Sequence, residues 1–243
     1  MNTIIRRPWR ALALAPALIF PVVALASPAA AAPVHCYGRV ADRVGTDAGE
    51  TIILENGRPW VVNTLGGNDV IIGADRDDVI CGGTGDDRIY GGGGNDKIAG
   101  NAGDDRIFGF EGDDQLEGFD GDDVLRGGDN NDRVEGGDGR DFVRDWGNDS
   151  VYGDTGNDTV RGAGGNDRYV IGGSGDDEVY GFGGNDTLID YSGHDFLFGG
   201  TGDDGLSAPD SQPSSANHDH LNGDGGVDRC RADTFDFLAN CEQ

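Results

Sequence analysis

Aspartates recur at an almost constant spacing through the middle of the chain, and they are the residues best suited to chemistry. The spacing is nine residues, apart from one shorter step before Asp149 and one longer step before Asp177. Carboxylates that repeat without matching His or Cys residues are hard oxygen ligands, which select Ca²⁺ over transition metals. The sequence therefore predicts metal ligands at sixteen positions: Asp69, Asp78, Asp87, Asp96, Asp105, Asp114, Asp123, Asp132, Asp141, Asp149, Asp158, Asp167, Asp177, Asp186, Asp195 and Asp204.

Each aspartate is the sixth residue of a repeated unit, G-G-x-G-(N/D)-D-x-U-x, in which U is apolar. Two residues before the aspartate, fourteen of the sixteen copies have Gly. Gly allows positive φ, so the first six residues predict a tight turn, and x-U-x predicts a short strand with U on one face. The expected inward positions are Ile71, Ile80, Ile89, Ile98, Ile107, Leu116, Leu125, Val134, Val143, Val151, Val160, Tyr169, Val179, Leu188, Leu197 and Leu206.

A three-residue strand buries little alone, so the copies must stack into a solenoid with one continuous apolar column. Two turns complete a circle, which predicts coils of two copies and turns that alternate between two flanks. Stacked carboxylates then lie about 4.8 Å apart on each flank. At an effective dielectric constant near 20, such a pair repels by about 3.5 kcal/mol. We therefore expect cations between the turns.

This unit resembles the RTX, or haemolysin-type, calcium-binding nonapeptide repeat, over residues 66–206. The resemblance implies an all-β fold, a parallel β-roll (a β-solenoid). It also implies that Ca²⁺ lies between consecutive turns of one flank, held by the sixth-position Asp and by backbone carbonyls of the Gly-rich turn. Sixteen turns on two flanks leave room for up to about 14 calcium ions.

Some copies depart from the pattern. Arg76 replaces the fourth-position Gly and tolerates left-handed geometry poorly, so the turn of Asp78 is expected to be the weakest site. The eight-residue copy around Trp146 and the ten-residue copy around Ile171 predict kinks or small bulges. Outward positions carry a ladder with eighteen-residue spacing (Ile72, Tyr90, Phe108), which suits either ligand binding or sheet stabilisation.

The first part of the chain predicts export. Residues 1–32 have basic residues followed by an apolar run broken by Pro16 and Pro21, with small residues at their end, as in a cleaved signal peptide rather than a membrane span. Residues 33–65 lack the Gly-Asp turns but keep the nine-residue ladder at Val44, Ile53 and Val62. We expect this segment to be an N-terminal cap of degenerate coils in a secreted, extracellular protein.

Four cysteines in a secreted chain favour two disulfides, with three possible connectivities. Cys81 follows an inward residue and so points outward, where a covering segment carrying Cys36 can reach it. Pairing of Cys36 with Cys81 and of Cys230 with Cys241 is therefore favoured. Residues 207–243 begin with a Pro/Ser-rich loop, and degenerate copies of the repeat then follow, which we expect to form a C-terminal cap.

Composition excludes some functions. A net charge of −27 argues against a nucleic-acid partner. No HExxH or GxSxG motif is present, and the segments outside the array are too short for a catalytic core. The repeated carboxylates share one environment, unlike an acid–base pair. We expect no enzymatic activity and no catalytic residue.

The interpretation is a secreted calcium-binding protein that folds on its ions; the alternatives are a calcium-stabilised adhesin or ligand-binding module and a hydrolase with an unrecognised site. The sequence names no protein or glycan partner.

Overall fold

The computed structural model describes residues 35–209, 218–232 and 236–242. The chain divides into two compact units, residues 1–32 and 33–243, and the first lies wholly outside the described residues. The predicted signal peptide therefore lies outside the described residues too. The described part of the second unit consists of strands, turns and bends, with no helix. No helix in it is long and apolar enough to cross a membrane.

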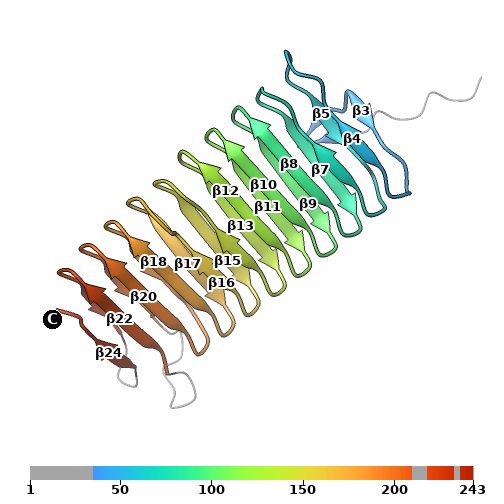
Figure 1. The fold of residues 1–243 in the computed structure, drawn as a ribbon. Coiled ribbons are helices and arrows are strands. Elements are labelled where there is room, and N and C mark those ends of the chain that lie inside the picture. The colour runs from blue at the N-terminus through green and yellow to red at the C-terminus, as the bar shows by residue number, and fades with distance from the viewer. Residues whose placement is uncertain (1–34, 210–217, 233–235, 243) are drawn as a thin grey trace, which may run out of the picture. The chain divides into compact units, whose positions relative to one another are not determined.

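Two parallel sheets of eleven strands form the second unit, and the chain alternates between them (Figure 1). A short antiparallel hairpin of β1 (His35–Cys36) and β2 (Arg39–Val40) precedes them. The odd-numbered sheet contains β3 (Arg43–Val44), β5 (Val61–Asn63), β7 (Val79–Thr84), β9 (Lys97–Ala102), β11 (Gln115–Asp120), β13 (Arg133–Asp138), β15 (Ser150–Thr155), β17 (Tyr169–Ser174), β19 (Thr187–Ile189), β21 (Gly205–Ser207) and β23 (Arg229–Arg231). The even-numbered sheet contains β4 (Thr51–Ile53), β6 (Val70–Ile72), β8 (Arg88–Gly93), β10 (Arg106–Glu111), β12 (Val124–Asp129), β14 (Phe142–Arg144), β16 (Thr159–Arg161), β18 (Glu178–Gly183), β20 (Phe196–Thr201), β22 (His220–Gly225) and β24 (Phe237–Ala239).

One coil contains two copies of the repeat, as expected. In the even-numbered sheet Ile89 pairs with Ile107, and in the odd-numbered sheet Ile98 pairs with Leu116, an offset of eighteen residues. We call the turns that lead from the odd-numbered to the even-numbered sheet the first flank, and those that lead back the second flank. Asp105 lies on the first flank and Asp96 on the second. The predicted all-β parallel β-roll is confirmed.

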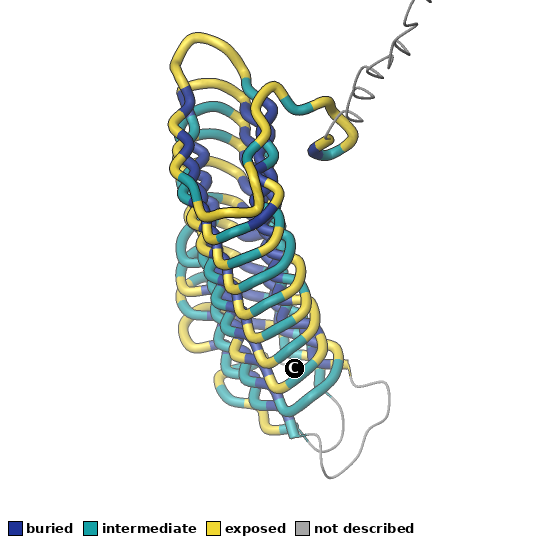
Figure 2. Tube along the Cα trace, turned by 90° about the vertical axis from the view of Figure 1, so that its right-hand side faces the viewer, coloured by how far each residue is buried: buried dark blue, intermediate teal, exposed yellow. Residues whose placement is uncertain are grey.

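The apolar column fills the space between the two sheets. Fifteen of the sixteen predicted inward residues are at most 1% exposed, and Leu221 extends the column beyond the array. Figure 2 shows the buried positions recurring from coil to coil. Many strands run for six residues, as in β8 and β10, and include the first glycines of the next unit. The turns are therefore shorter than the predicted six residues.

The prediction was wrong at Tyr169. Val170, not Tyr169, is fully buried, and it pairs with Val151 and Leu188. Tyr169 pairs with Ser150, which directly follows Asp149, whereas Tyr169 is two residues after Asp167. The ten-residue copy therefore has its extra residue just after Asp167. The amide of Arg168 still donates to the carbonyl of Asp149, so the insertion is absorbed as a local bulge ahead of β17.

The N-terminal ladder was also misassigned at two positions. Ile52 is buried and pairs with Ile71, whereas Ile53 is 60% exposed and Val44 is 46% exposed. Val62 is buried as predicted. The pairing offset here is nineteen residues, as in Ile52 with Ile71, and one extra residue in a coil exchanges the inward and outward faces of a strand.

Both ends of the roll carry a disulfide, and both favoured pairings are confirmed. Cys36 brings the β1–β2 hairpin onto the outer face of the odd-numbered sheet, where Tyr37 packs with Val79, Cys81 and Ala99. At the other end, β22 and β23 add a further coil to the array, and β24 pairs with β22. The disulfide between Cys230 and Cys241 lies in this terminal part.

Candidate metal centre

The sixteen predicted aspartates all lie at the entrance to a strand and are all buried, with at most 5% of each residue exposed. The pairing of the coils places those of one flank in register, so Asp87 lies between Asp69 and Asp105. One carboxylate oxygen, Oδ1, accepts a hydrogen bond from the backbone amide of the aspartate one coil earlier. The N–O distance is 2.8 Å from Asp69 to Asp87 and 2.7 Å from Asp87 to Asp105. Neighbouring coils are therefore tied together through these side chains.

The second oxygen, Oδ2, has no such partner at most of these positions. It is buried without a hydrogen-bond partner at Asp69, Asp87, Asp96, Asp105, Asp114, Asp123, Asp132, Asp141, Asp149, Asp158, Asp167, Asp177, Asp186 and Asp204. A buried carboxylate oxygen that lacks a partner is costly, because it has lost its water without replacement. The same cost recurs in coil after coil on both flanks, which points to a shared ligand rather than to local strain.

The unpartnered oxygens point into the turns, at the first-position glycines. Beside Gly100, a Cβ atom would collide with Oδ2 of Asp105 and lie 3.0 Å from the carbonyl oxygen of Gly118 in the next coil. The same pair, a carboxylate oxygen and a carbonyl oxygen of the next coil, meets beside Gly82, Gly91, Gly109, Gly118, Gly136, Gly153, Gly181, Gly199 and Gly223. Gly is needed because any side chain would fill this space. The donor set is all oxygen, which fits Ca²⁺.

Burial also changes the acidity of these groups. Loss of hydration raises the pKa of Asp87 to about 6 and that of Asp96, Asp105 and Asp141 to about 8. Hydrogen bonds from backbone amides oppose this rise, and neighbouring carboxylates add to it. Without a cation, these turns would hold protons near neutral pH. A cation bound there would displace those protons.

The fifth-position Asn and Asp residues have a different role, which sequence reasoning missed. They lie on the exposed side of each turn and accept a hydrogen bond from the amide one coil later. Oδ1 of Asp104 accepts from Asp122 at 3.0 Å, and Oδ1 of Asp122 accepts from Arg140 at 2.9 Å. The fifth and sixth side chains thus link a coil to its neighbours in opposite directions. The restriction of the fifth position to Asn or Asp in most copies was the available signal.

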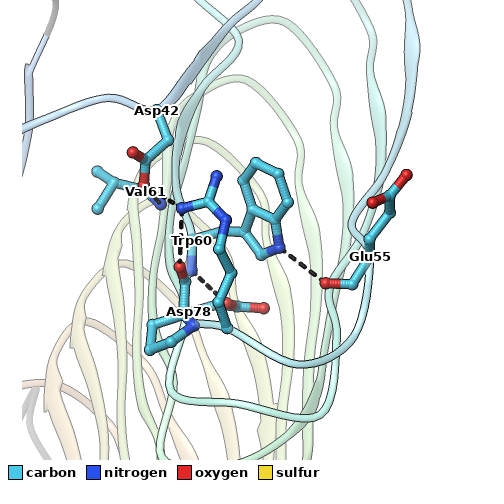
Figure 3. Close-up of polar contacts among 7 residues, drawn as sticks. Asp42, Glu55, Trp60, Val61 and Asp78 are labelled. Atoms are coloured by element: carbon cyan, nitrogen blue, oxygen red, sulfur yellow. Dashed lines mark hydrogen bonds and ion pairs between the residues drawn. The ribbon is translucent and has the colours of Figure 1, made fainter.

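The contacts of Asp42 and Asp78, at the start of the roll, differ from those in the middle of the array (Figure 3). Asp78 accepts the amide of Trp60 at 2.7 Å in the usual way, but its Oδ2 also accepts the amide of Ala74 at 3.0 Å. Asp78 therefore has less free ligand capacity than most other sixth-position aspartates. Arg76 is not among the residues with positive φ, so the reason given for a weak site does not apply, and its weakness stays a prediction. Asp42 accepts the amide of Val61 at 3.1 Å, the reverse of the direction seen in the array, and pairs with Arg58 at 3.5 Å.

Two further aspartates face the interior of the turns, and the sequence reasoning missed both. Asp145 and Asp190 stand where most copies have the first-position Gly, and they are 1% and 0% exposed. Burial, with help from neighbouring carboxylates, raises the pKa of each to about 9. The signal was a charged residue at a Gly position.

Comparison with known proteins agrees with this geometry. The RTX calcium-binding nonapeptide repeat (4 copies) matches residues 63–98, 90–118, 108–143, 145–179 and 171–206, more than half of the chain. No curated protein matches significantly. Among solved structures, a hyperactive, Ca²⁺-dependent, β-helical antifreeze protein from an Antarctic bacterium is similar. Its identity is 23% over 80% of each chain, with a TM-score of 0.32. The aspartate ladder and the family match together show that this chain belongs to the RTX calcium-binding nonapeptide-repeat family.

Proposed function

We propose that this chain is a secreted protein that binds many Ca²⁺ ions and folds as it binds them. One observation carries the proposal: buried carboxylate oxygens without partners recur along both flanks, most of them beside a backbone carbonyl of the next coil. Asp69 and its fifteen equivalents would supply carboxylate ligands, and the Gly-rich turns would supply carbonyl ligands. With up to about 14 gaps between stacked turns, the ions would offset much of the net charge of −27.

Calcium suits these turns better than magnesium does. Ca²⁺ accepts six to eight oxygen ligands in irregular geometry, whereas Mg²⁺ needs a compact octahedron and keeps its water. A turn lined by carbonyls and one carboxylate per coil provides many oxygens at no fixed angle. Because each site needs two adjacent turns, the unfolded chain has no site, and binding energy becomes folding energy.

The proposal is tested by removing calcium. In a metal chelator the chain should lose most of its β-type circular dichroism, and calcium at millimolar concentration should restore it. Magnesium at the same concentration should restore much less. A chain that keeps its β signal in chelator, or that responds equally to both ions, would contradict the proposal.

Secretion is part of the same proposal. The two disulfides suit an oxidising compartment. Extracellular calcium modules commonly work at a Kd of roughly 10⁻⁴–10⁻³ M, far above cytosolic free calcium. Expression of the full chain in an exporting host, followed by mass spectrometry of the extracellular protein, tests this. The expected product begins between residues 27 and 33, and retention of residues 1–32 inside the cell would count against export.

We also propose a second candidate function: binding of an acidic polysaccharide at a local row of arginines on the outer face of the even-numbered sheet, once calcium on the flanks offsets the net charge of −27. The predicted ladder is present, with the rings of Tyr90 and Phe108 stacked 5.3 Å apart. Further along it, Arg126, Arg144 and Arg161 are paired in register, and none forms an ion pair with a described residue. Aromatic rings can stack on sugar rings, and guanidinium groups can pair with their acidic substituents.

A shallow pocket marks the most suitable place on this face. It has a volume of about 300 Å³ and is lined by Arg144, Trp146, Arg161, Ala163 and Phe182. Sulfated dextran should bind calcium-loaded protein with Kd raised at least about tenfold by R144Q/R161Q, whereas R88Q/R106Q, on the same sheet, should change it little. Equal losses in both double variants would indicate general charge attraction, and binding of neutral dextran with equal affinity would exclude this role for the arginines.

A further inference from the structure

Asp145 and Asp190 each complete a cluster of three carboxylates. Asp145 joins Asp132 and Asp149 on the second flank, and Asp190 joins Asp177 and Asp195 on the first flank. In each cluster, three carboxylate oxygens, one from each residue, lie within 4.8 Å of one another, and all the residues are buried. Among the described residues, each flank therefore has one such cluster, which differs from the remaining turns.

The contacts of Asp145 aim one of its oxygens into the turn. Its Oδ1 accepts hydrogen bonds from the amides of Gly128, at 2.7 Å, and Trp146, at 2.8 Å. Its Oδ2 has no partner and converges with Oδ2 of Asp132 on the space beside Gly127. The side chain is fixed by its first oxygen, so the second oxygen is held ready for a ligand.

Asp190 repeats this arrangement on the other flank. Its Oδ1 accepts from the amides of Tyr191, at 2.7 Å, and Gly173, at 3.2 Å. Its Oδ2 has no partner and meets Oδ2 of Asp177 beside Gly172. Two separate Gly-to-Asp departures thus give the same geometry. This repetition, together with the unpartnered buried oxygens, distinguishes the clusters from a chance gathering of acidic residues.

The clusters differ from ordinary turns in charge. Beside Gly109, the space is approached by one carboxylate oxygen, from Asp114, and by the carbonyl oxygen of Gly127. Beside Gly127, the carboxylate of Asp145 takes the place of that carbonyl. Calcium affinity rises with the number of charged ligands. A divalent ion would also relieve the repulsion between the Asp145 and Asp132 carboxylates and between the Asp190 and Asp177 carboxylates, whose Oδ2 atoms have no hydrogen-bond partner.

We propose that Asp132–Asp145–Asp149 and Asp177–Asp190–Asp195 form two calcium sites of higher affinity than the other turns, which fill first and start the folding of the array. This inference rests on the proposed calcium-binding function. The first cluster joins coils offset by seventeen residues, as in Val134 with Val151, so its ion would also fix the register where the repeat loses a residue.

The test counts the ions that remain at low calcium. The calcium-loaded protein is dialysed to a free calcium concentration about tenfold below its folding midpoint, and bound calcium is measured by atomic emission. The parent chain should retain two ions, D145N one, and D145N/D190N none. D105N, a matched removal of one charge from an ordinary turn, should retain two. If D145N fails to fold at saturating calcium, D145G, which restores the Gly of the repeat, replaces it in this test.

A second readout locates the first ion. In W9F/W60F, Trp146 is the only tryptophan and lies next to Asp145, so Tb³⁺ bound there should luminesce on tryptophan excitation. Half-maximal emission should occur at a Tb³⁺ concentration about tenfold lower than in the same protein with D145N. Equal ion retention in D145N and D105N, or no early Tb³⁺ emission, would overturn the inference while leaving calcium-coupled folding intact. A parent chain that binds no calcium at millimolar concentration would instead overturn the proposed function.

Discussion

Most sixth-position aspartates use their two carboxylate oxygens differently. Oδ1 ties the coil to its neighbour through a backbone amide, and Oδ2 remains available to a cation. The family motif gives the position of the residue but does not separate these two roles. Substitution by Asn, which keeps an oxygen at Oδ1, and by Ala, which removes both oxygens, separates them.

Asp105 is suited to this comparison because it lies in the middle of the array. A buried hydrogen bond to a charged group contributes about 1.5–3 kcal/mol, and this lost free energy is spread over all the sites of the cooperative array. D105A should therefore raise the calcium midpoint of folding about threefold to tenfold. D105N should have a smaller effect. Calcium titrations followed by circular dichroism measure both.

Asp42 provides the control. Its carboxylate is about 40% exposed, it pairs with Arg58, and its neighbours lack the Gly-rich turn. D42A should therefore shift the midpoint by less than about twofold. A shift as large as that of D105A would mean that residues 33–65 bind calcium like the array.

The misassigned residue near the insertion gives a second prediction. Val170 is fully buried in the apolar column, whereas Tyr169 is half-buried on the outside. V170A should lower the free energy of unfolding by about 1–3 kcal/mol, and Y169A by less. Urea unfolding at saturating calcium measures both; a larger loss in Y169A would restore the original sequence assignment.

At the scale of single residues, the repeat period predicted the positions of the buried aspartates and of most inward apolar residues. The assignment was wrong at Tyr169, where the repeat gains a residue. All sixteen predicted aspartates occupy equivalent buried places because a nine-residue repeat leaves no other register. Asp145 and Asp190 were missed because they stand at the first position of the unit, and the sequence pattern alone does not show which way a charged side chain there points. Only the structure shows that each points into the same space as Asp132 or Asp177.

At the scale of strands and turns, the coil followed from the sequence, but the ends did not. Two copies close one coil because the turns are alike and the strands are short. In residues 33–65, Ile52 and Ile53 are adjacent and both apolar, as are Val61 and Val62. Hydrophobicity alone cannot choose which member faces inward. The pairing with Ile71, set by a nineteen-residue offset, makes that choice.

The turns predict how the metal-free fold depends on pH. Their carboxyl groups have raised pKa values in the folded state, about 6 at Asp87 and about 8 at Asp105, against 3.8 as the reference value. A raised pKa means that the folded state binds protons more tightly than the unfolded chain. This contribution to stability is complete below about pH 4 and is lost as the pH rises through 6 to 8.

In metal-free buffer, the β signal should therefore be strongest near pH 4 to 5 and should fall between pH 6 and 8. With calcium, the direction reverses, because protons compete with the ion and the calcium midpoint should rise as the pH falls. Circular dichroism at a series of pH values, with and without calcium, checks both signs. A metal-free signal that increases toward pH 8 would show that these carboxyl groups do not oppose folding.

At the scale of the described array, each coil contacts mainly its neighbouring coils, so the array behaves as a one-dimensional stack. Its apolar column is narrow, one Ile, Leu or Val per copy, and its flanks carry repeated negative charge. Calcium supplies the attraction between coils that this composition lacks. Its removal should therefore affect the whole array and not only single turns.

The most direct test of this account is the size of the protein during a calcium titration. Residues 33–243 are purified in chelator, and the hydrodynamic radius is measured as calcium is added. We predict a cooperative collapse from an expanded to a compact form with a midpoint between about 0.1 and 1 mM. A chain that is already compact in chelator, or a midpoint below about 1 μM, would contradict calcium-driven folding outside the cell.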